Sequence, residues 1–265
     1  GRGPARGHDL IRRSDRGLNV LDGANGRPAE EARRLVGDGR VSAGFDAEAP
    51  DPVYLRAEAA GSGHTARVTI LGRHDRIVEI RRDGAALPAE SAATGTDDDG
   101  PALARLAAIP VRDLIGEVLS MDTAPIDFLL EAARTNRDAA LSDFENGQAN
   151  LGPALKRFNA ARTDQGTLTD RVQAMTAAAA EARMRGLPVS VYSLSGSGNH
   201  GITALLSVYV VAEELGADPE HLCRALALAS LLAVYVKAQT GRLTSYCGCA
   251  IAPATGVTAA TVYLM

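Results

Sequence analysis

Residues 202–237 read ITALLSVYVVAEELGADPEHLCRALALASLLAVYVK and contain two runs that are apolar on nearly every side. Neither run reaches the roughly 20 uncharged residues that a membrane span needs, which favours two buried helices of a soluble protein. Between the runs, Asp218 can cap a helix that has Pro219 at its first position and Glu220 in its first turn. We therefore expect a helical core built around these two runs, and no membrane partner.

A small sheet is predicted upstream of this core. Three runs between about residues 52 and 84, PVYLRAEAA, TARVTILGR and RIVEIRRDG, alternate apolar and polar residues and are separated by turns that contain glycine. This pattern is typical of an antiparallel β-meander. Helical periodicity begins at VRDLIGEVLSM and continues to the end of the chain. The predicted fold class is α+β, a small antiparallel β-meander subdomain followed by a larger all-α domain of buried, alanine-rich helices.

The same patterns predict the domain boundaries. Residues 1–16 lack any apolar period, and we expect them to be unstructured and leave them unassigned. Residues 17–100 form the small α+β subdomain, which starts with a surface helix in GRPAEEARRLVGDG, where Pro28 lies near the helix start. A loop, AATGTDDDGPA, precedes the helical domain at 101–265.

Composition narrows the classes of function. Lys and Arg number 28 against 32 Asp and Glu, a balance that gives no electrostatic signature of nucleic-acid binding. The three cysteines do not make a disulfide framework, and the polar, Arg-rich N-terminal segment does not resemble a signal peptide, so we expect a cytoplasmic protein. Because aromatic residues make up only 4%, the core must consist of small aliphatic side chains, which predicts close helix packing.

A glycine-rich stretch, SLSGSGNHGITALL at residues 193–206, precedes the first apolar run. Glycines at 196, 198 and 201 permit positive φ angles, and they let backbone N–H groups approach an anion at a helix start. The alternative is a plain turn between packed helices. His200 could be a base, a ligand or a capping residue.

Two cysteines follow the second apolar run as Cys247-Gly-Cys249. This spacing suits an internal disulfide poorly, but it can present two thiolates to a metal or cluster. Spacing alone favours the alternative of small buried residues in a tight loop. Cys223 lies inside an apolar helix, where cysteine usually acts as a small hydrophobe. Lys237 and Arg242 could neutralise an anion, although capping of the preceding helix is the simpler interpretation.

Taken in order, these motifs resemble the serine dehydratase α-chain-like family, which includes L-cysteine desulfidases. The matching elements are Gly196 to Gly201, Arg224 to Leu228, Lys237, Gly241 to Thr244 and Cys247 to Cys249, and the resemblance covers roughly residues 17–265. Family members also carry Gly-Cys-Thr-Glu-Pro and Cys-Asp-Gly-Ala-Lys segments that are absent here, so the chain looks like an internal fragment.

The resemblance implies a lyase that works without pyridoxal phosphate and uses an oxygen-sensitive [4Fe–4S] cluster. An open iron would ligate the β-thiol or β-hydroxyl of L-cysteine or L-serine while a base removes the α-proton, giving pyruvate and ammonia, with sulfide from cysteine. No base is identified. The metal ligands implied are Cys247 and Cys249. The substrate-binding residues implied are Ser195, Ser197, Asn199, His200, Lys237 and Arg242.

The missing cysteines leave the ligand set for a cluster incomplete, so weak or absent activity is expected from this chain. A homo-oligomer would be compatible with the sequence. The alternative function is a catalytically inactive helical module that binds a small anion or a partner protein.

Overall fold

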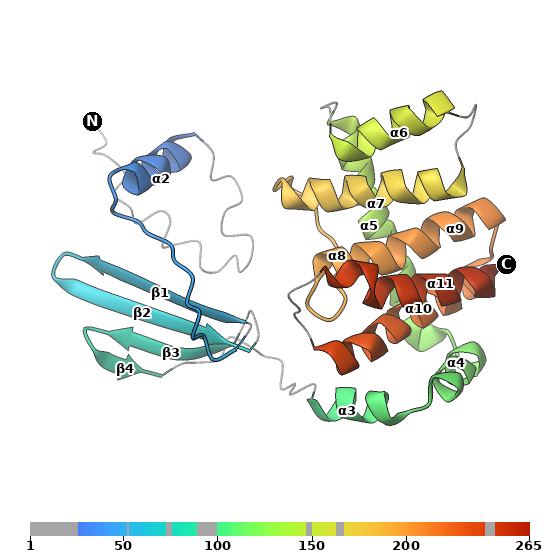
Figure 1. The fold of residues 1–265 in the computed structure, drawn as a ribbon, viewed down its shortest axis with the longest axis horizontal. Helices are drawn as coiled ribbons and strands as arrows, with labels where there is room; N and C mark the ends of the chain where they lie inside the picture. Colours follow the sequence, from blue (N-terminus) through green and yellow to red (C-terminus); the bar gives the residue numbers. More distant parts are fainter. Residues whose placement is uncertain are drawn as a thin grey trace. The chain divides into compact units, whose positions relative to one another are not determined.

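The computed structural model describes residues 26–51, 53–72, 76–88, 100–146, 150–162, 167–241 and 247–265 (Figure 1). The chain divides into two compact units, one ending at Pro50 and the other beginning at Asp51. The described part of the first unit contains α2 (Arg27–Gly37), in which Pro28 occupies the first turn, and this agrees with the predicted surface helix. Residues 1–16 and 89–99 lie outside the described residues, so the boundary near residue 100 stays a prediction.

The second unit begins with a four-stranded antiparallel sheet in the order β1-β2-β3-β4 (Figure 1). Its strands are β1 (Tyr54–Gly61), β2 (His64–Leu71), β3 (Ile77–Arg82) and β4 (Ala85–Leu87). Two-residue turns join β1 to β2 and β3 to β4, and in each turn both residues have positive φ, 53° and 79° at Ser62-Gly63 and 49° and 80° at Asp83-Gly84. Such turns match the twist of the flanking strands. The predicted meander is confirmed, with β4 as an additional short strand.

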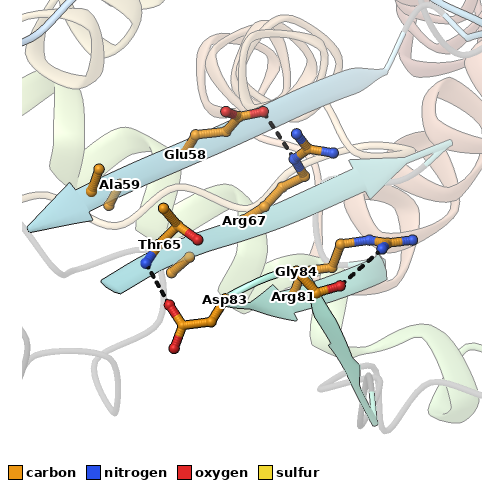
Figure 2. A pocket seen from close by; sticks show the side chains of 9 residues that line it. Glu58, Ala59, Thr65, Arg67, Arg81, Asp83 and Gly84 are labelled. Atoms are coloured by element: carbon orange, nitrogen blue, oxygen red, sulfur yellow. Dashed lines mark hydrogen bonds and ion pairs between the residues drawn. The ribbon is translucent and has the colours of Figure 1, made fainter. Parts of the chain in front are cut away.

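One face of the sheet carries charged side chains around a shallow hollow (Figure 2). Arg67 donates to Glu58 across the first strand pair at 2.9 Å, and Asp83 accepts the backbone N–H of Thr65 at 2.8 Å. This hydrogen bond, followed by one from His64, lowers the pKa of the Asp83 carboxyl. Asp83 therefore connects the β3–β4 turn to the start of β2.

The remainder of the second unit is helical. The helices are α3 (Gly100–Ala108), α4 (Val111–Ser120), η2 (Ala124–Ile126), α5 (Phe128–Glu145), α6 (Leu151–Arg162), α7 (Leu168–Met184), α8 (Gly198–Gly201), η3 (Ile202–Leu206), α9 (Ser207–Leu215), α10 (Pro219–Thr240), η4 (Gly248–Ala250) and α11 (Ala252–Leu264). A four-stranded antiparallel sheet followed by a mostly helical region confirms the predicted α+β class.

The long helix α10 lies in the core and packs along α11 (Figure 1). The Asp218 carboxylate accepts the His221 N–H at 2.8 Å with Pro219 at the helix start, which confirms the predicted cap. Within the described ranges α10 is the one helix long and apolar enough to cross a membrane, and half of that stretch is buried inside the structure. Its buried side chains include Leu226, Leu228 and Leu232, as expected for a core helix.

Small residues let the helices approach closely, as the low aromatic content predicts. A Cβ atom at Gly256 of α11 would lie 2.1 Å from the carbonyl oxygen of Ala229 in α10. At Gly152 of α6, a Cβ atom would lie 2.5 Å from the Cβ of Ala178 in α7. Both distances are shorter than van der Waals contact, so these helix pairs keep their spacing only with glycine at these positions.

We predict that Gly256→Ala lowers the free energy of unfolding by about 1–3 kcal/mol, because the added methyl group forces α10 and α11 apart. The matched control is Gly116→Ala in α4, where a Cβ atom would meet nothing within 4 Å. That substitution should raise stability by about 0.5–1 kcal/mol through helix propensity. Urea unfolding of both variants measures the difference, and equal effects would contradict the packing argument.

Candidate active site

The glycine-rich stretch forms a tight turn followed by a helix start. Leu194 and Ser197 exchange backbone N–H···O=C hydrogen bonds of 3.0 and 3.1 Å. The two residues between them, Ser195 and Gly196, have φ angles of 49° and 80°. Positive φ at both central positions is the geometry of a type I′ turn, and Gly196 adopts it without strain.

The helix after this turn starts at a serine cap and includes a π-helical segment. The hydroxyl of Ser197 accepts the backbone N–H of His200 at 3.3 Å. The four residues of α8 continue directly into η3, a π-helical turn, and then into α9. Short π-helical turns inside helices occur often at functional sites. Within η3, the Thr203 hydroxyl donates to the carbonyl oxygen of Asn199 at 2.9 Å.

A buried asparagine holds the segment before the turn. The side chain of Asn136 in α5 accepts the Tyr192 N–H at 2.8 Å and donates to the Tyr192 carbonyl oxygen at 3.4 Å. The same carbonyl oxygen lies 1.9 Å from where a Cβ of residue 201 would be, so only glycine fits at Gly201. Asn136 therefore fixes the backbone against which the helix start packs, a role that the sequence did not indicate.

Lys237, near the end of α10, reaches the turn from the other side. Its Nζ donates to the Ser195 carbonyl oxygen at 3.0 Å and lies 3.2 Å from Nδ1 of His200. Only 4% of Lys237 and 8% of His200 are exposed. Burial lowers the pKa of Lys237 below its usual value, and a charge on Cys249 partly opposes this. Burial, followed by the charge of Lys237, lowers the pKa of His200.

The Cys-Gly-Cys segment includes the short helix η4. Cys247 is exposed, whereas Cys249 is partly buried. Burial raises the pKa of the Cys249 thiol, the neighbouring Cys247 raises it further, and a hydrogen bond with the Thr203 side chain lowers it. The two thiols are thus adjacent, and Cys249 contacts the π-helical segment. Cys223 is only 1% exposed in the core and donates its thiol to the Ile126 carbonyl oxygen at 3.3 Å, as expected for a structural cysteine.

A hollow of about 350 Å³ lies beside Cys249. Its walls come from α6, α7, α8, η3 and η4. Small and apolar side chains form much of the lining, and polar groups are supplied by Gln173, Thr176, Asn199 and Thr203. This combination of an apolar wall with a few convergent polar groups is typical of small-molecule sites.

Arg183 of α7 is a further residue at this site. Its guanidinium donates to the Asn199 side-chain oxygen at 3.2 Å. A Cβ atom at Gly198 would lie 2.5 Å from the Arg183 Nε, so Gly198 makes room for this side chain. Arg183 is not among the residues predicted from sequence, although it lies in the segment EARMRG that precedes the glycine-rich stretch.

The structure brings together part of the predicted set. Lys237, His200 and the Ser195 backbone form one group, and Asn199 and Cys249 line the hollow. The Ser197 hydroxyl caps the helix start, and Arg242 lies outside the described residues. Substrate binding by the six predicted residues, which are Ser195, Ser197, Asn199, His200, Lys237 and Arg242, stays a prediction. Metal binding by Cys247 and Cys249 also stays a prediction.

The two adjacent thiols fit an iron–sulfur cluster in kind, since thiolates are the usual ligands of such clusters. Two thiols are, however, too few ligands for such a cluster. In the described part of the chain, no three His, Cys, Asp or Glu side chains are grouped so that they could hold a metal ion. These residues therefore supply an incomplete ligand set.

Acid should destabilise the protein through His200. The pKa of His200 is lowered in the folded state. As the pH falls toward and below the usual value of about 6.5, the unfolded chain therefore binds more protons at this residue than the folded protein does, and the free energy of unfolding decreases. We predict that the free energy of unfolding of His200→Gln falls less steeply between pH 7.5 and 5, by up to about 1.4 kcal/mol per pH unit. Lys237→Met should reduce the slope by a smaller amount, because burial is the larger cause. Urea unfolding across this range measures the slopes, and parallel slopes in all three proteins would contradict the assignment.

Comparison with known proteins identifies relatives. A model of the serine dehydratase alpha chain family matches residues 53–265. A UPF0597 protein of Methanocella arvoryzae is 35% identical over 257 residues, which cover 97% of this chain and 59% of the relative. A UPF0597 protein of Caldanaerobacter subterraneus is 34% identical over 254 residues, which cover 96% of this chain and 58% of the relative.

The chain thus spans less than two thirds of the length of these relatives. No solved structure matches it. The family match covers the sheet, the glycine-rich turn and the Cys-Gly-Cys segment, in agreement with the resemblance found in the sequence. The chain belongs to the serine dehydratase alpha chain family.

Proposed function

We propose that the complete protein catalyses an iron–sulfur-dependent β-elimination of a small amino acid without pyridoxal phosphate. Its substrate is L-cysteine, which would give pyruvate, ammonia and sulfide, or L-serine, which would give pyruvate and ammonia. The observation that carries the proposal is the position of Cys249 at the wall of a hollow that Asn199 and Thr203 also line. Membership of the family supports a reaction of the dehydratase or lyase type.

The hollow suits a small polar substrate. Its volume of about 350 Å³ is large enough to accept a three-carbon amino acid. We place the substrate carboxylate near Asn199, where the Arg183 guanidinium already donates to the amide oxygen. Arginine is well suited to this task because its planar donors match a carboxylate.

Cys247 and Cys249 are the ligands that this chain would offer to a cluster. A bound cluster would supply a Lewis-acidic iron that makes the β-substituent a better leaving group. Since the described residues offer two thiols, further ligands would have to come from elsewhere in the protein or from a partner subunit. The proposal includes a cytoplasmic location and allows a homo-oligomer, and it involves neither nucleic acid nor a membrane.

The second candidate function is a catalytically inactive helical module that binds a small anion or a partner protein. The incomplete ligand set among the described residues favours this candidate. It predicts no iron uptake, whereas the first candidate requires it.

The test is anaerobic reconstitution of the complete protein with iron and sulfide, followed by assays of pyruvate from L-cysteine and from L-serine. We expect cluster absorbance and pyruvate with the native sequence. Cys249→Ala should lower both bound iron and pyruvate formation by at least about tenfold, since loss of a ligand disrupts the cluster.

The matched control is Cys223→Ala, which removes a buried thiol that does not line the hollow. This variant should keep its iron content and its activity. Absence of both cluster absorbance and pyruvate in the native protein would reject the first candidate, and iron content separates it from the second.

A further inference from the structure

The sheet has one long edge that is free within the described residues. There, β1 pairs with β2 alone, and the strand at the opposite edge, β4, is only three residues long. Every residue of β1 after Tyr54 is exposed. A free edge strand presents a row of backbone N–H and C=O groups that can pair with a strand of another chain. Strand β1 contains neither proline nor lysine, the residues that commonly protect such an edge.

The observed pairing shows which backbone groups of β1 point to the free edge. The N–H of Gly72 donates to the carbonyl oxygen of Val53 at 2.8 Å, so the backbone groups of Val53 point toward β2. The direction alternates from residue to residue along a strand, so odd-numbered residues of β1 also point toward β2. The residues whose backbone groups point to the free edge are therefore Tyr54, Arg56, Glu58 and Ala60.

The side chains of β1 alternate between a charged face and an apolar face. Arg56 and Glu58 lie on the charged face, at 3.4 Å from one another, and their side chains are 49% and 52% exposed. Figure 2 shows Glu58 beside Arg67 of β2, which donates to it at 2.9 Å. The apolar face of β1 carries Leu55 and two alanines, and Leu55 is 54% exposed. The edge thus offers one positive charge, one negative charge and a small apolar strip.

These side chains suit pairing with β1 of a second copy across a two-fold axis. Residues that lie opposite each other in an antiparallel pair point to the same face. With Ala57 opposite the partner's Ala57, Arg56 lies opposite the partner's Glu58, and Glu58 lies opposite the partner's Arg56. Backbone groups that point to the free edge then meet their equivalents in the partner. On the apolar face, Leu55 lies opposite the partner's Ala59.

Other registers lack this complementarity. An axis at residue 56 would set Arg56 against the partner's Arg56, and an axis at residue 58 would set Glu58 against the partner's Glu58. Like charges directly opposite each other destabilise a sheet. An axis between two residues would oppose backbone groups that point to the free edge with groups that point to β2, and no ladder of hydrogen bonds could form. The charges therefore favour the register centred on Ala57.

We propose that β1 is a dimerisation edge, at which two copies of this chain pair antiparallel about a two-fold axis at Ala57 and are held by reciprocal ion pairs between Arg56 and Glu58. A second copy is favoured over an unrelated strand, because each chain supplies both charges at the spacing that its own copy requires. Such a self-complementary contact is the usual interface of a two-fold dimer. The inference is independent of the proposed function, because it uses no residue of the hollow.

The first test exchanges the charges in the complete protein, with analytical ultracentrifugation as the measurement. The native protein should be a dimer. In Arg56→Glu and in Glu58→Arg, like charges face each other across the axis, so each variant should raise the dissociation constant of the dimer by at least about tenfold. An equal mixture of the two variants should dimerise again, because every negative charge then faces a positive one.

The matched control is Arg112→Glu, the same change of charge at an exposed residue of α4, which should leave the dimer intact. Circular dichroism shows whether each variant is folded. A native monomer, a dimer that resists both single substitutions, or a mixture that does not associate would overturn the inference. A native monomer would mean that another segment of the complete protein or a different partner covers this edge.

The second test fixes the register and does not depend on the folding of Glu58→Arg. At Ala57 the two copies form a pair without backbone hydrogen bonds, in which the Cα atoms lie about 4.5 Å apart, within the range of a disulfide. Ala57→Cys should therefore give a covalent dimer on a non-reducing gel after treatment with oxidised glutathione. Ala59→Cys, on the same face but opposite the partner's Leu55, should give no more than the native protein, in which Cys247 is exposed. Equal cross-linking of the two variants would overturn the register.

Discussion

The candidate site depends on one buried ammonium group. Transfer of a lysine charge out of water is costly unless its donors are satisfied. Here Lys237 is satisfied by the Ser195 carbonyl oxygen and by His200. Ser195 is a central residue of the turn and adopts a positive φ of 49°, an uncommon conformation for a residue other than glycine. The energy of the buried charge thus holds the turn, the start of α8 and the end of α10 in one arrangement.

Glycines make this arrangement sterically possible. Gly201 allows the helix start to touch the Tyr192 carbonyl, and Gly198 leaves space for the Arg183 side chain. Behind the site, Gly256 brings α11 against α10, the helix that carries Lys237. Gly201 in the site and Gly256 in the core therefore serve the same purpose, which is to bring backbones to distances that a Cβ atom would forbid.

Local sequence patterns predicted the elements that are determined by residues close together in the chain. Helix α10 was recognised because its cap, Asp218, and its apolar run are neighbours in sequence. Helix α6 lies within the predicted helical domain but was not singled out as an element, and its first N–H groups, at Leu151 and Gly152, bond to Glu181, some 30 residues away. Strand β4 has only three residues, which are too few to show an alternation of apolar and polar side chains. The roles of Asn136 and Arg183 were hidden for the same reason as α6, because their partners lie 56 and 16 residues further along the chain. The grouping of Lys237 with His200 was likewise beyond local pattern, although both residues had been selected as candidates.

Lys237 and Cys249 are electrostatically linked. A charge on Cys249 raises the pKa of Lys237, and interaction energies are reciprocal, so the ammonium must also favour the Cys249 thiolate. Burial acts in the opposite sense and raises the pKa of this thiol. Because the thiolate is the form that binds metals, burial, the neighbouring Cys247, the Thr203 hydrogen bond and the Lys237 charge together affect how readily Cys249 can serve as a ligand. The ammonium that lowers the pKa of His200 is thus the same group that interacts with Cys249, and a change at Lys237 must affect both residues.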